Sequence, residues 1–264
     1  MDERWLPARG PVGARTPEEV ATLAARAADL AELDAAIASC FACPRLVAWR
    51  ERVAVEKRAA FRDQEYWARP VPGFGPADAR IAILGLAPAA HGGNRTGRIF
   101  TGDRSGDVLF AALYRVGLAN QPTSVAAGDG LELRHTRIFA SVRCAPPDNK
   151  PAPAERDACS GWLHREVALL APGLRVVVAL GAFAWAAWWS AMTAAYGVPP
   201  PAPRPRFAHG AQWSGRGVPH VLGCYHVSQQ NTFTGRLTPA MLDGVLTRAR
   251  RLAGLGEATY TGAG

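Results

Sequence analysis

The chain has 264 residues, of which 48% are hydrophobic, so its composition supports a folded core and excludes global disorder. The formal net charge of +8 favours a polyanionic partner, although 28 of the 30 basic residues are arginines in a chain that is also rich in Ala, Gly and Pro. No apolar window reaches the ~20 residues that a membrane span requires, and no signal segment follows the acidic start at Asp2. We therefore expect a soluble, cytoplasmic protein that makes no contact with membranes.

The first part of the chain predicts an arm followed by helices. Residues 1–16 contain two prolines and two glycines and are expected to form a flexible arm. Thr16, followed by a proline and two glutamates, is typical of a helix start, and the pattern predicts one helix over 17–39. A Cys-x-x-Cys clip at 40–43 ends that helix, and a second helix is expected over 46–61.

Four apolar runs predict the strands of one sheet, at 81–84, 137–143, 174–180 and 218–225. Helical patterns separate or follow them, after Ser105, over 153–170, after Gly181 and from Thr238 to Leu252. Strands that alternate with helices form parallel sheets covered on both faces. The sequence therefore predicts an α/β fold, a three-layer α/β/α sandwich with a central four-stranded parallel sheet. We expect a single domain over 17–253 and a flexible tail over 254–264.

The segment 85–103 follows the first predicted strand and is rich in glycine. Polar side chains lie between the glycines, namely those of His91, Asn94, Arg95, Thr96, Arg98 and Asp103. Long glycine-rich loops at the carboxyl ends of strands are where open α/β sheets bind their ligands. An ordinary connection between a strand and a helix is the alternative, but the length and polarity favour an active-site loop.

Four of the five cysteines could supply thiolate ligands: Cys40, Cys43, Cys144 and Cys159. A site with four thiolates suits either zinc or an iron–sulfur cluster, and the spacing alone does not separate the two. Cysteines that only fill the core are the other alternative. Cys224 falls in the fourth predicted strand and is expected to be a core residue.

Two motifs and these cysteines resemble one known family. Residues 85–103 (GLAPAAHGGNRTGRIFTGD) resemble the first motif of the family 5 uracil-DNA glycosylases, and residues 226–237 (HVSQQNTFTGRL) resemble the second. The resemblance implies a monofunctional DNA glycosylase that hydrolyses the N-glycosidic bond of uracil and other deaminated bases, such as hypoxanthine, to start base excision repair. It also implies a structural 4Fe–4S cluster on the same four cysteines.

The resemblance assigns roles around the base. Hydrolysis develops negative charge on the departing base and positive charge on the sugar, so a hydrogen-bond donor and an oriented water are needed. The second-motif histidine faces the uracil carbonyl in the family, which implies that His226 stabilises the departing base. Phe100 matches the family's stacking aromatic, and Gly85 and Ala87 are expected to lie against the base. Of the other histidines, only His91 lies in a comparable loop.

The residue that orients the water is not given by the resemblance. Other branches of the superfamily carry Asp or Asn where this chain has Ala87, and an alanine cannot orient water. Asn94 and Asn149 are the predicted catalytic substitutes, with Asp103 behind them, although either asparagine could be a turn former. The second predicted strand also lacks the asparagine that reads uracil in families 1 and 4, which predicts looser discrimination among deaminated bases.

Contacts with DNA are expected from both motifs. The second motif is predicted to enter the minor groove with polar side chains and one aromatic wedge, provided by Ser228, Gln230, Asn231, Phe233 and Arg236. Phosphate contacts are predicted for Arg95, Arg98 and Arg236. The expected partner is double-stranded DNA with a damaged base, with single-stranded DNA as a further candidate. The protein is expected to be a monomer associated with the nucleoid.

The main alternative is a non-catalytic nucleic-acid-binding module with a structural zinc site made by the four cysteines. A nucleotide-binding α/β enzyme is disfavoured, because the chain has neither a GxGxxG motif nor a phosphate-loop lysine. Glycine-containing loops after two different strands favour a catalytic cleft over the binding module. The colour of the purified protein separates the two metal sites, since a 4Fe–4S protein is brown and a zinc protein is colourless.

Overall fold

The structure, a computed structural model, describes residues 13–256 and contains a five-stranded sheet in the order β2-β1-β3-β5-β4. Its strands are β1 (Ile81–Gly85), β2 (Thr136–Ala140), β3 (Val176–Leu180), β4 (Gln212–Trp213) and β5 (His220–Cys224). The pairs β1–β2, β1–β3 and β3–β5 are parallel, and β4 pairs antiparallel with β5. The predicted four-stranded parallel sheet is confirmed, and the two-residue antiparallel edge strand adds to it.

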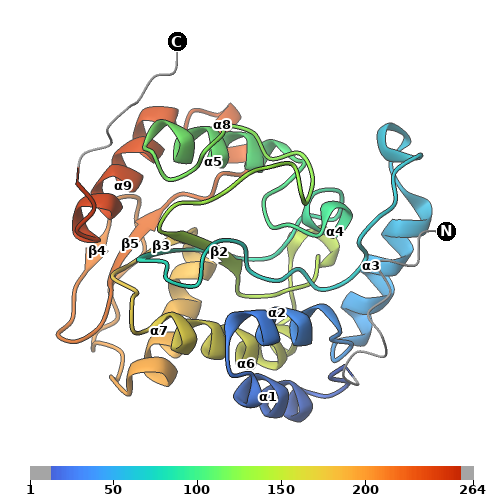
Figure 1. Cartoon of the computed structure of the whole chain (residues 1–264), viewed down its shortest axis with the longest axis horizontal. Coiled ribbons are helices and arrows are strands. Elements are labelled where there is room, and N and C mark those ends of the chain that lie inside the picture. The colour runs from blue at the N-terminus through green and yellow to red at the C-terminus, as the bar shows by residue number, and fades with distance from the viewer. Residues whose placement is uncertain (1–12, 257–264) are drawn as a thin grey trace.

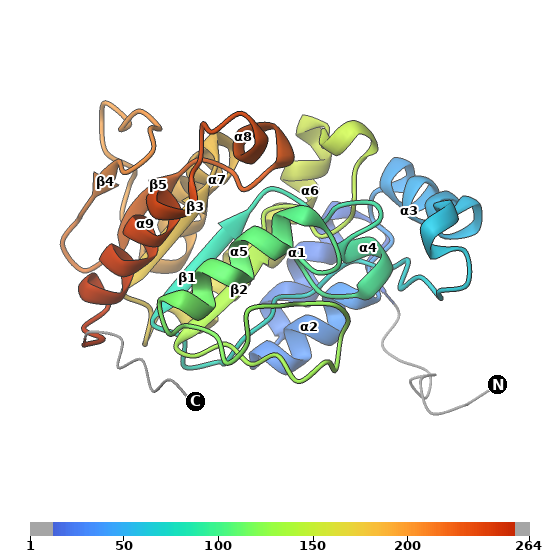
Figure 2. The same ribbon diagram turned by 90° about the horizontal axis from the view of Figure 1, so that it is seen from above.

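Helices cover both faces of this sheet. Their bounds are α1 (Pro17–Arg26), α2 (Leu30–Ala38), α3 (Pro44–Glu56), α4 (Gly93–Thr96), α5 (Arg104–Arg115), α6 (Pro153–Leu170), α7 (Ala182–Tyr196), α8 (Gln229–Phe233) and α9 (Pro239–Leu252), with 3-10 turns at Ala59–Phe61 and Pro147–Asn149. Helices α5 and α9 lie on one face and α6 and α7 on the other, with α1 and α2 packed outside α6 (Figures 1 and 2). Across residues 13–256, every helix is too short or too polar to span a bilayer.

The strands are buried on both faces, as parallel strands between two helical layers must be. In β1, Ile81 and Ile83 belong to the core under α5 and α9, whereas Ala82 and Leu84 belong to the core under α6 and α7. This division follows the two-residue period of a strand, in which successive side chains point to opposite faces. The apolar run is therefore continuous in sequence because both alternating sets of side chains need a core.

The predicted helix over 17–39 is two helices, α1 and α2. The backbone leaves the helical conformation at Ala27, which has ψ 117°. Asp29 then starts α2 by accepting a hydrogen bond from the Glu32 amide at 2.9 Å, and the Glu32 carboxylate accepts one from the Ala28 amide at 2.8 Å. This reciprocal cap satisfies amides that a continuous helix would have bonded internally. The break allows both helices to pack against α6.

The described end of the predicted arm packs against the body. Ala14 is fully buried, and its carbonyl accepts a hydrogen bond from the Phe41 amide at 2.7 Å. Residues 1–12 of the predicted arm and residues 257–264 of the predicted tail lie outside the described residues.

A buried ion-pair network joins β2, α2 and α6. Glu166 is fully buried and accepts hydrogen bonds from Arg143 and from Arg137 Nε, the latter at 2.6 Å. Arg137 also contacts the carboxylate of Asp34 on α2 at 2.7 Å. Although burial opposes its charge, the two arginines hold the pKa of Glu166 below its ordinary value. The charged network therefore persists at neutral pH and fixes the segment after β2 that carries Arg143.

Candidate active site

A cleft of about 1260 Å³ opens at the carboxyl ends of the parallel strands. It is lined by Ala87 after β1, Asn149 after β2, Gly181 after β3 and His226 after β5. The connection from β1 runs to its neighbour on one side, and the chain then returns across β1 to β3 on the other side. Such a switch in strand order leaves a crevice where ligands bind. The fold therefore brings loops that are distant in sequence into one site.

His226 and Phe100 lie next to each other in the wall of this cleft. Both residues line it, and their ring centroids lie 6.1 Å apart with the ring planes tilted by 41°. The Asn231 side-chain amide donates to the His226 carbonyl at 2.8 Å and fixes the backbone that carries the imidazole. Burial lowers the pKa of His226, so its imidazole is neutral at neutral pH and can act as a hydrogen-bond donor.

Two glycines lie next to these rings, Gly85 for lack of space and Gly181 for its backbone conformation. A Cβ on Gly85 would lie 3.0 Å from the Phe100 ring, so a side chain at position 85 would push the ring from its place over the end of β1. Gly181 has a φ of +94°, and a Cβ there would lie 3.4 Å from His226 Cβ. Gly85 itself is buried behind Phe100, whereas Ala87 lies on the cleft wall.

The structure separates the two asparagines that the sequence offered as catalytic residues. Asn149 is exposed, lines the cleft and has a φ of 55°, as does its neighbour Asp148 with 54°. Asn94 is fully buried and is not part of the cleft wall. Its amide donates to the Arg50 carbonyl of α3 at 3.2 Å, and its Oδ1 has no partner in the described part of the chain. Asn149 thus joins His226 in the cleft, and Asn94 lies behind the loop.

Asp103 also lines the cleft but serves as a helix cap. Its side chain accepts a hydrogen bond from the Gly106 amide at 3.0 Å at the start of α5. Burial raises the pKa of this carboxyl group, against the opposing effect of hydrogen bonds from the backbone of α5. The loop packs closely here, because a Cβ on Gly92 would meet the Asp103 carboxylate.

Arg95 and Arg98, predicted as phosphate contacts, are both buried and bonded within the protein. Arg95 donates to the carbonyls of His91 and Gly102, each at 2.8 Å, and to Gln64 Oε1 at 2.5 Å. Arg98 pairs with Asp129 at 2.6 Å. Burial raises the pKa of Asp129, but the hydrogen bond from Arg98 and others from the backbone hold that pKa well below its usual range. These placements correct the prediction, because the two guanidinium groups stabilise loops and are not free for DNA.

The second motif contains the short helix α8, where the sequence predicted a loop. The side chains of Ser228, Gln230, Asn231 and Arg236 line the cleft. Phe233 is 68% exposed, and the Arg104 guanidinium lies 5.8 Å from its ring centroid. The Arg236 guanidinium lies over the Tyr225 ring at 4.6 Å. The segment therefore presents polar groups, one exposed aromatic ring and a cation beside His226.

Several residues of the cleft wall were not predicted from the sequence. Arg58 and Phe61 come from the turn after α3, Val125 from the loop before β2, Phe183 from α7, and Phe207 from the proline-rich segment. None of these lies in a motif. Phe183 and Val125 are large and exposed, at 53% and 64%, which is visible only once the fold is known.

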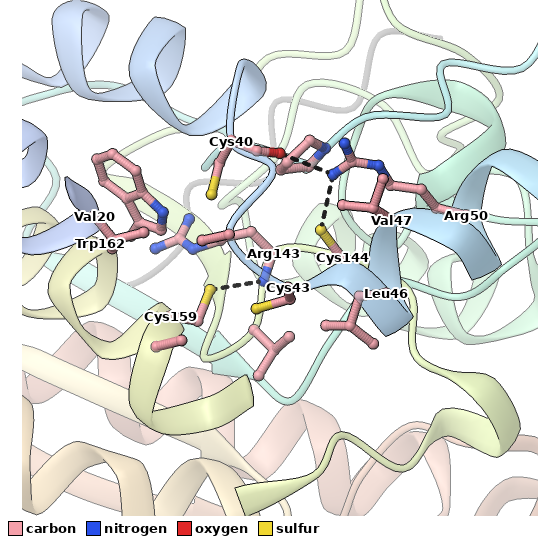
Figure 3. Close-up of a pocket in the computed structure, with 14 residues that line it drawn as sticks. Val20, Cys40, Cys43, Leu46, Val47, Arg50, Arg143, Cys144, Cys159 and Trp162 are labelled. Carbon is pink, nitrogen blue, oxygen red and sulfur yellow. Dashed lines mark hydrogen bonds between the residues drawn. The ribbon is translucent and has the colours of Figure 1, made fainter. Parts of the chain in front are cut away.

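Four cysteines surround a second, small cavity of about 20 Å³ beside α3 and α6. Figure 3 shows the sulfur atoms of Cys40, Cys43, Cys144 and Cys159 facing the same space, whereas Cys224 lies in β5. Across residues 13–256, no three or more His, Cys, Asp or Glu side chains are arranged so as to hold a single metal ion. The four thiols are nevertheless the four that the sequence grouped.

Buried cationic and amide donors face these sulfur atoms. Arg50 is fully buried and donates to Cys144 Sγ at 3.2 Å and to the Cys40 carbonyl at 3.1 Å. The Arg143 amide donates to Cys159 Sγ at 3.4 Å. Burial raises the pKa of Cys43 to about 12 and that of Cys144 to about 11. Without a bound metal, both side chains are therefore thiols at neutral pH. Arg50 and Arg143 each retain two buried side-chain nitrogen atoms without a hydrogen-bond partner in the described residues.

Comparison with known proteins agrees with this architecture and its cleft. A sequence model described as "Uracil DNA glycosylase superfamily" matches residues 72–250. The chain therefore belongs to the uracil DNA glycosylase superfamily. Within it, the chain is 58% identical over 234 residues to a protein of Mycobacterium tuberculosis named type-5 uracil-DNA glycosylase, covering 88% of this chain and 85% of the relative.

Two further relatives carry the same name. The type-5 uracil-DNA glycosylase of Mycobacterium leprae is 55% identical over 238 residues, which cover 88% of this chain and 100% of the relative. That of Thermus thermophilus is 53% identical over 219 residues, covering 83% and 96%. The resemblance stated from the two motifs is confirmed.

Proposed function

We propose that this protein is a monofunctional DNA glycosylase that removes uracil, and other deaminated bases such as hypoxanthine, from DNA and so starts base excision repair. The observation that carries the proposal is the pairing of Phe100 and His226, from the two motifs, as neighbouring rings 6.1 Å apart in the wall of one cleft. An aromatic face can stack a base that has left the duplex, and a neutral imidazole can bond its polar edge. A module that only binds nucleic acid needs no such pair.

His226 is assigned the hydrogen bond to the departing base. As the glycosidic bond lengthens, negative charge moves onto the base, and a fixed donor in a partly dry site stabilises that charge. The lowered pKa of His226 means that the donor is a neutral N–H, which requires no buried counter-charge. The Asn231 bond to its carbonyl supports the required position.

Asn149 is assigned the water that attacks the sugar. Ala87 lines the cleft at the position where other branches have a carboxylate or an amide, and it has no group that could hold a water. Asn149 reaches the same cleft from the segment after the neighbouring parallel strand β2 and offers both a donor and an acceptor. Its left-handed backbone supports this assignment, because such conformations cluster at functional sites.

The positions of the lysine side chains support direct hydrolysis of the glycosidic bond without a covalent intermediate. A glycosylase that also cleaves the strand forms a Schiff base through an amine, and lysine is the usual nucleophile. The chain contains two lysines, Lys57 and Lys150, and neither lines the cleft. Base release should therefore leave an intact strand with an abasic site.

DNA contacts are assigned to the second motif. Arg236 and Gln230 lie on the cleft wall, and the exposed ring of Phe233 can wedge between base steps. We expect double-stranded DNA with a damaged base as the main substrate and single-stranded DNA as a further one. The protein is expected to act as a monomer in the cytoplasm, associated with the nucleoid.

The four cysteines fit a structural 4Fe–4S cluster. Four thiolates are the ligands such a cluster requires, and two buried arginines with unpaired N–H groups complement the net negative charge that cluster and thiolates would share. The cluster would join the end of α2 and the start of α3 to the loop after β2 and to α6. The visible absorption and the iron content of anaerobically purified protein distinguish this cluster from a four-cysteine zinc site. The protein should be brown and contain about four irons per chain.

The substrate range is tested with a panel of duplexes, each carrying uracil, hypoxanthine or xanthine at one position. Alkali-labile sites should form in the uracil duplex and the hypoxanthine duplex. No residue of β2 lines the cleft, so fewer side chains read the base edge and several deaminated bases can be accepted. Binding to all duplexes without base release from any would contradict the proposed function.

A further inference from the structure

The turn after α3, residues 57–66, lies at one end of the cleft, where two of its residues line the wall, and is called the wing. Figure 1 shows it following α3 beside α4 at the edge of the molecule, and it contributes Arg58 and Phe61 to the cleft wall. It begins at Lys57, whose φ is 46°, and contains the 3-10 turn Ala59–Phe61. Neither of the two motifs includes it, and no role in the reaction described above requires it.

Arg95 fixes the wing to the active-site loop. Its guanidinium lies 3.9 Å from the Phe61 ring centroid and bonds Gln64 Oε1, while its other N–H groups hold the carbonyls of His91 and Gly102. Three hydrogen bonds and a stacked ring leave this buried arginine little freedom. The wing is therefore held at a defined position against the glycine-rich loop.

His91 lies where the loop meets the wing. The Tyr66 hydroxyl, which is buried with its ring, contacts His91 Nδ1 at 3.0 Å, and the two rings meet edge to face. His91 lines the cleft, and Nε2 has no protein partner in the described part of the chain. Burial, Arg58 and Arg95 lower the pKa of His91, so the imidazole is neutral. When the tyrosine donates to Nδ1, the histidine carries its own hydrogen on Nε2.

Arg58 supplies the charge at this corner. Its side chain is exposed, lines the cleft and has no hydrogen-bond or ion-pair partner among residues 13–256. Lys57 lies nearby, with Nζ 6.0 Å from the Tyr66 ring centroid. Arg58 and His91 line the same cleft, and the Arg58 charge is close enough to act on the imidazole. An unpaired guanidinium together with a neutral N–H donor is suited to a tetrahedral oxyanion, because arginine presents several donors to such a group.

We propose that Arg58 and His91 bind one backbone phosphate of the DNA strand at the wing end of the cleft, with Tyr66 holding the imidazole. This inference rests on the proposed function for its ligand, since it names where that DNA is held. It assigns the phosphate contact to residues outside the second motif. It also explains the contacts of the buried Arg95, which hold the wing and His91 in fixed positions relative to each other.

The test measures affinity for a duplex with an abasic-site analogue, in which single phosphates near the lesion are replaced by neutral methylphosphonates. For the unaltered protein, replacement at one position should weaken binding most. Arg58→Ala should weaken binding to the all-phosphate duplex by roughly tenfold or more, as expected for a charged hydrogen bond. The variant should lose no further affinity when that one phosphate is neutral, and its salt dependence should fall by about one unit of slope.

Matched variants separate the contact from general effects of charge. Arg248→Ala removes an exposed arginine from α9 that is not part of the cleft, so it should bind all duplexes like the unaltered protein. Tyr66→Phe keeps the charge and should weaken binding only where the same phosphate is present. Equal losses for Arg58→Ala at every methylphosphonate position, or no loss at all, would overturn the proposal.

Base release is measured separately on a uracil duplex, so the two proposals can fail independently. Binding with the expected phosphate dependence but no release of uracil contradicts the glycosylase activity alone. Release of uracil without any phosphate-specific effect of Arg58→Ala contradicts the phosphate site alone.

Discussion

Replacing His226 by alanine should slow base release by about 10²–10³, the loss that follows removal of one preorganised donor to a developing anion. The structure supports a value in this range, because the imidazole is partly buried, held by Asn231 through its carbonyl and next to the Phe100 ring. The loss corresponds to about 2.7–4 kcal/mol of transition-state stabilisation. It should appear in the single-turnover rate on a uracil duplex and much less in binding.

The leaving group provides the control. A 5-fluorouracil base departs as a more stable anion, so it needs less help from a donor. His226→Ala should therefore be partly rescued on a 5-fluorouracil duplex. Asn149→Ala should show a similar loss on both duplexes, because the water and the sugar cation do not depend on the base.

Asn94→Ala tests the placement of the second asparagine. This residue is buried and bonded to Arg50 of α3, so its loss should lower thermal stability together with activity. Equal rescue of all three variants by fluorine would refute the division of labour between His226 and Asn149. Undiminished activity of Asn149→Ala would leave the water without its assigned partner.

Further predictions concern the cysteines, the buried ion pairs and pH. Cys144→Ala should lose both the brown colour and thermal stability, whereas Cys224→Ala should keep the colour, and bleaching of the second variant would disprove the ligand assignment. Glu166→Gln should cost about 3–5 kcal/mol in the free energy of unfolding, measured by denaturant, because the buried Arg143 loses its counter-charge and Arg137 keeps only that of Asp34, and an effect below about 1 kcal/mol would contradict a fully buried pair. Burial lowers the pKa of several histidines, so the folded protein binds fewer protons than the unfolded chain. Their contribution to stability is present above about pH 6.5 and is lost as pH falls, and calorimetry should show a melting temperature that decreases below that pH.

Local signals in the sequence were sufficient for most of the fold. The helix over 153–170 was predicted with its observed bounds, because a proline at the first position and an apolar stripe are both local features. The four parallel strands follow from apolar runs whose two alternating sets of side chains each meet a core. The strand at Gln212–Trp213 has only two residues, too few to show any period. The break after α1 depends on Asp29 and Glu32, whose capping pattern lies inside an apparently continuous apolar stripe.

The residues of the site were predicted less completely, because the composition of a loop does not determine which side chains point into the cleft. The first motif offered Asn94, Arg95 and Arg98 as polar groups, and all three turn into the protein. Asn149 and His226 reach the cleft because the ends of β2 and β5 lie at the same edge of the sheet. Arg58 lies outside both motifs in the sequence, and only the tertiary fold shows that its turn lines the cleft.

The most direct test of the central claim is the identity of the products formed from a uracil-containing duplex. Purified protein should release free uracil, detected by mass spectrometry, and should leave an unbroken strand with one abasic site. Borohydride added during the reaction should trap no protein–DNA adduct, because no lysine lines the cleft. A stable adduct, or tight binding without any free base, would contradict the assignment of this cleft to direct hydrolysis of the glycosidic bond.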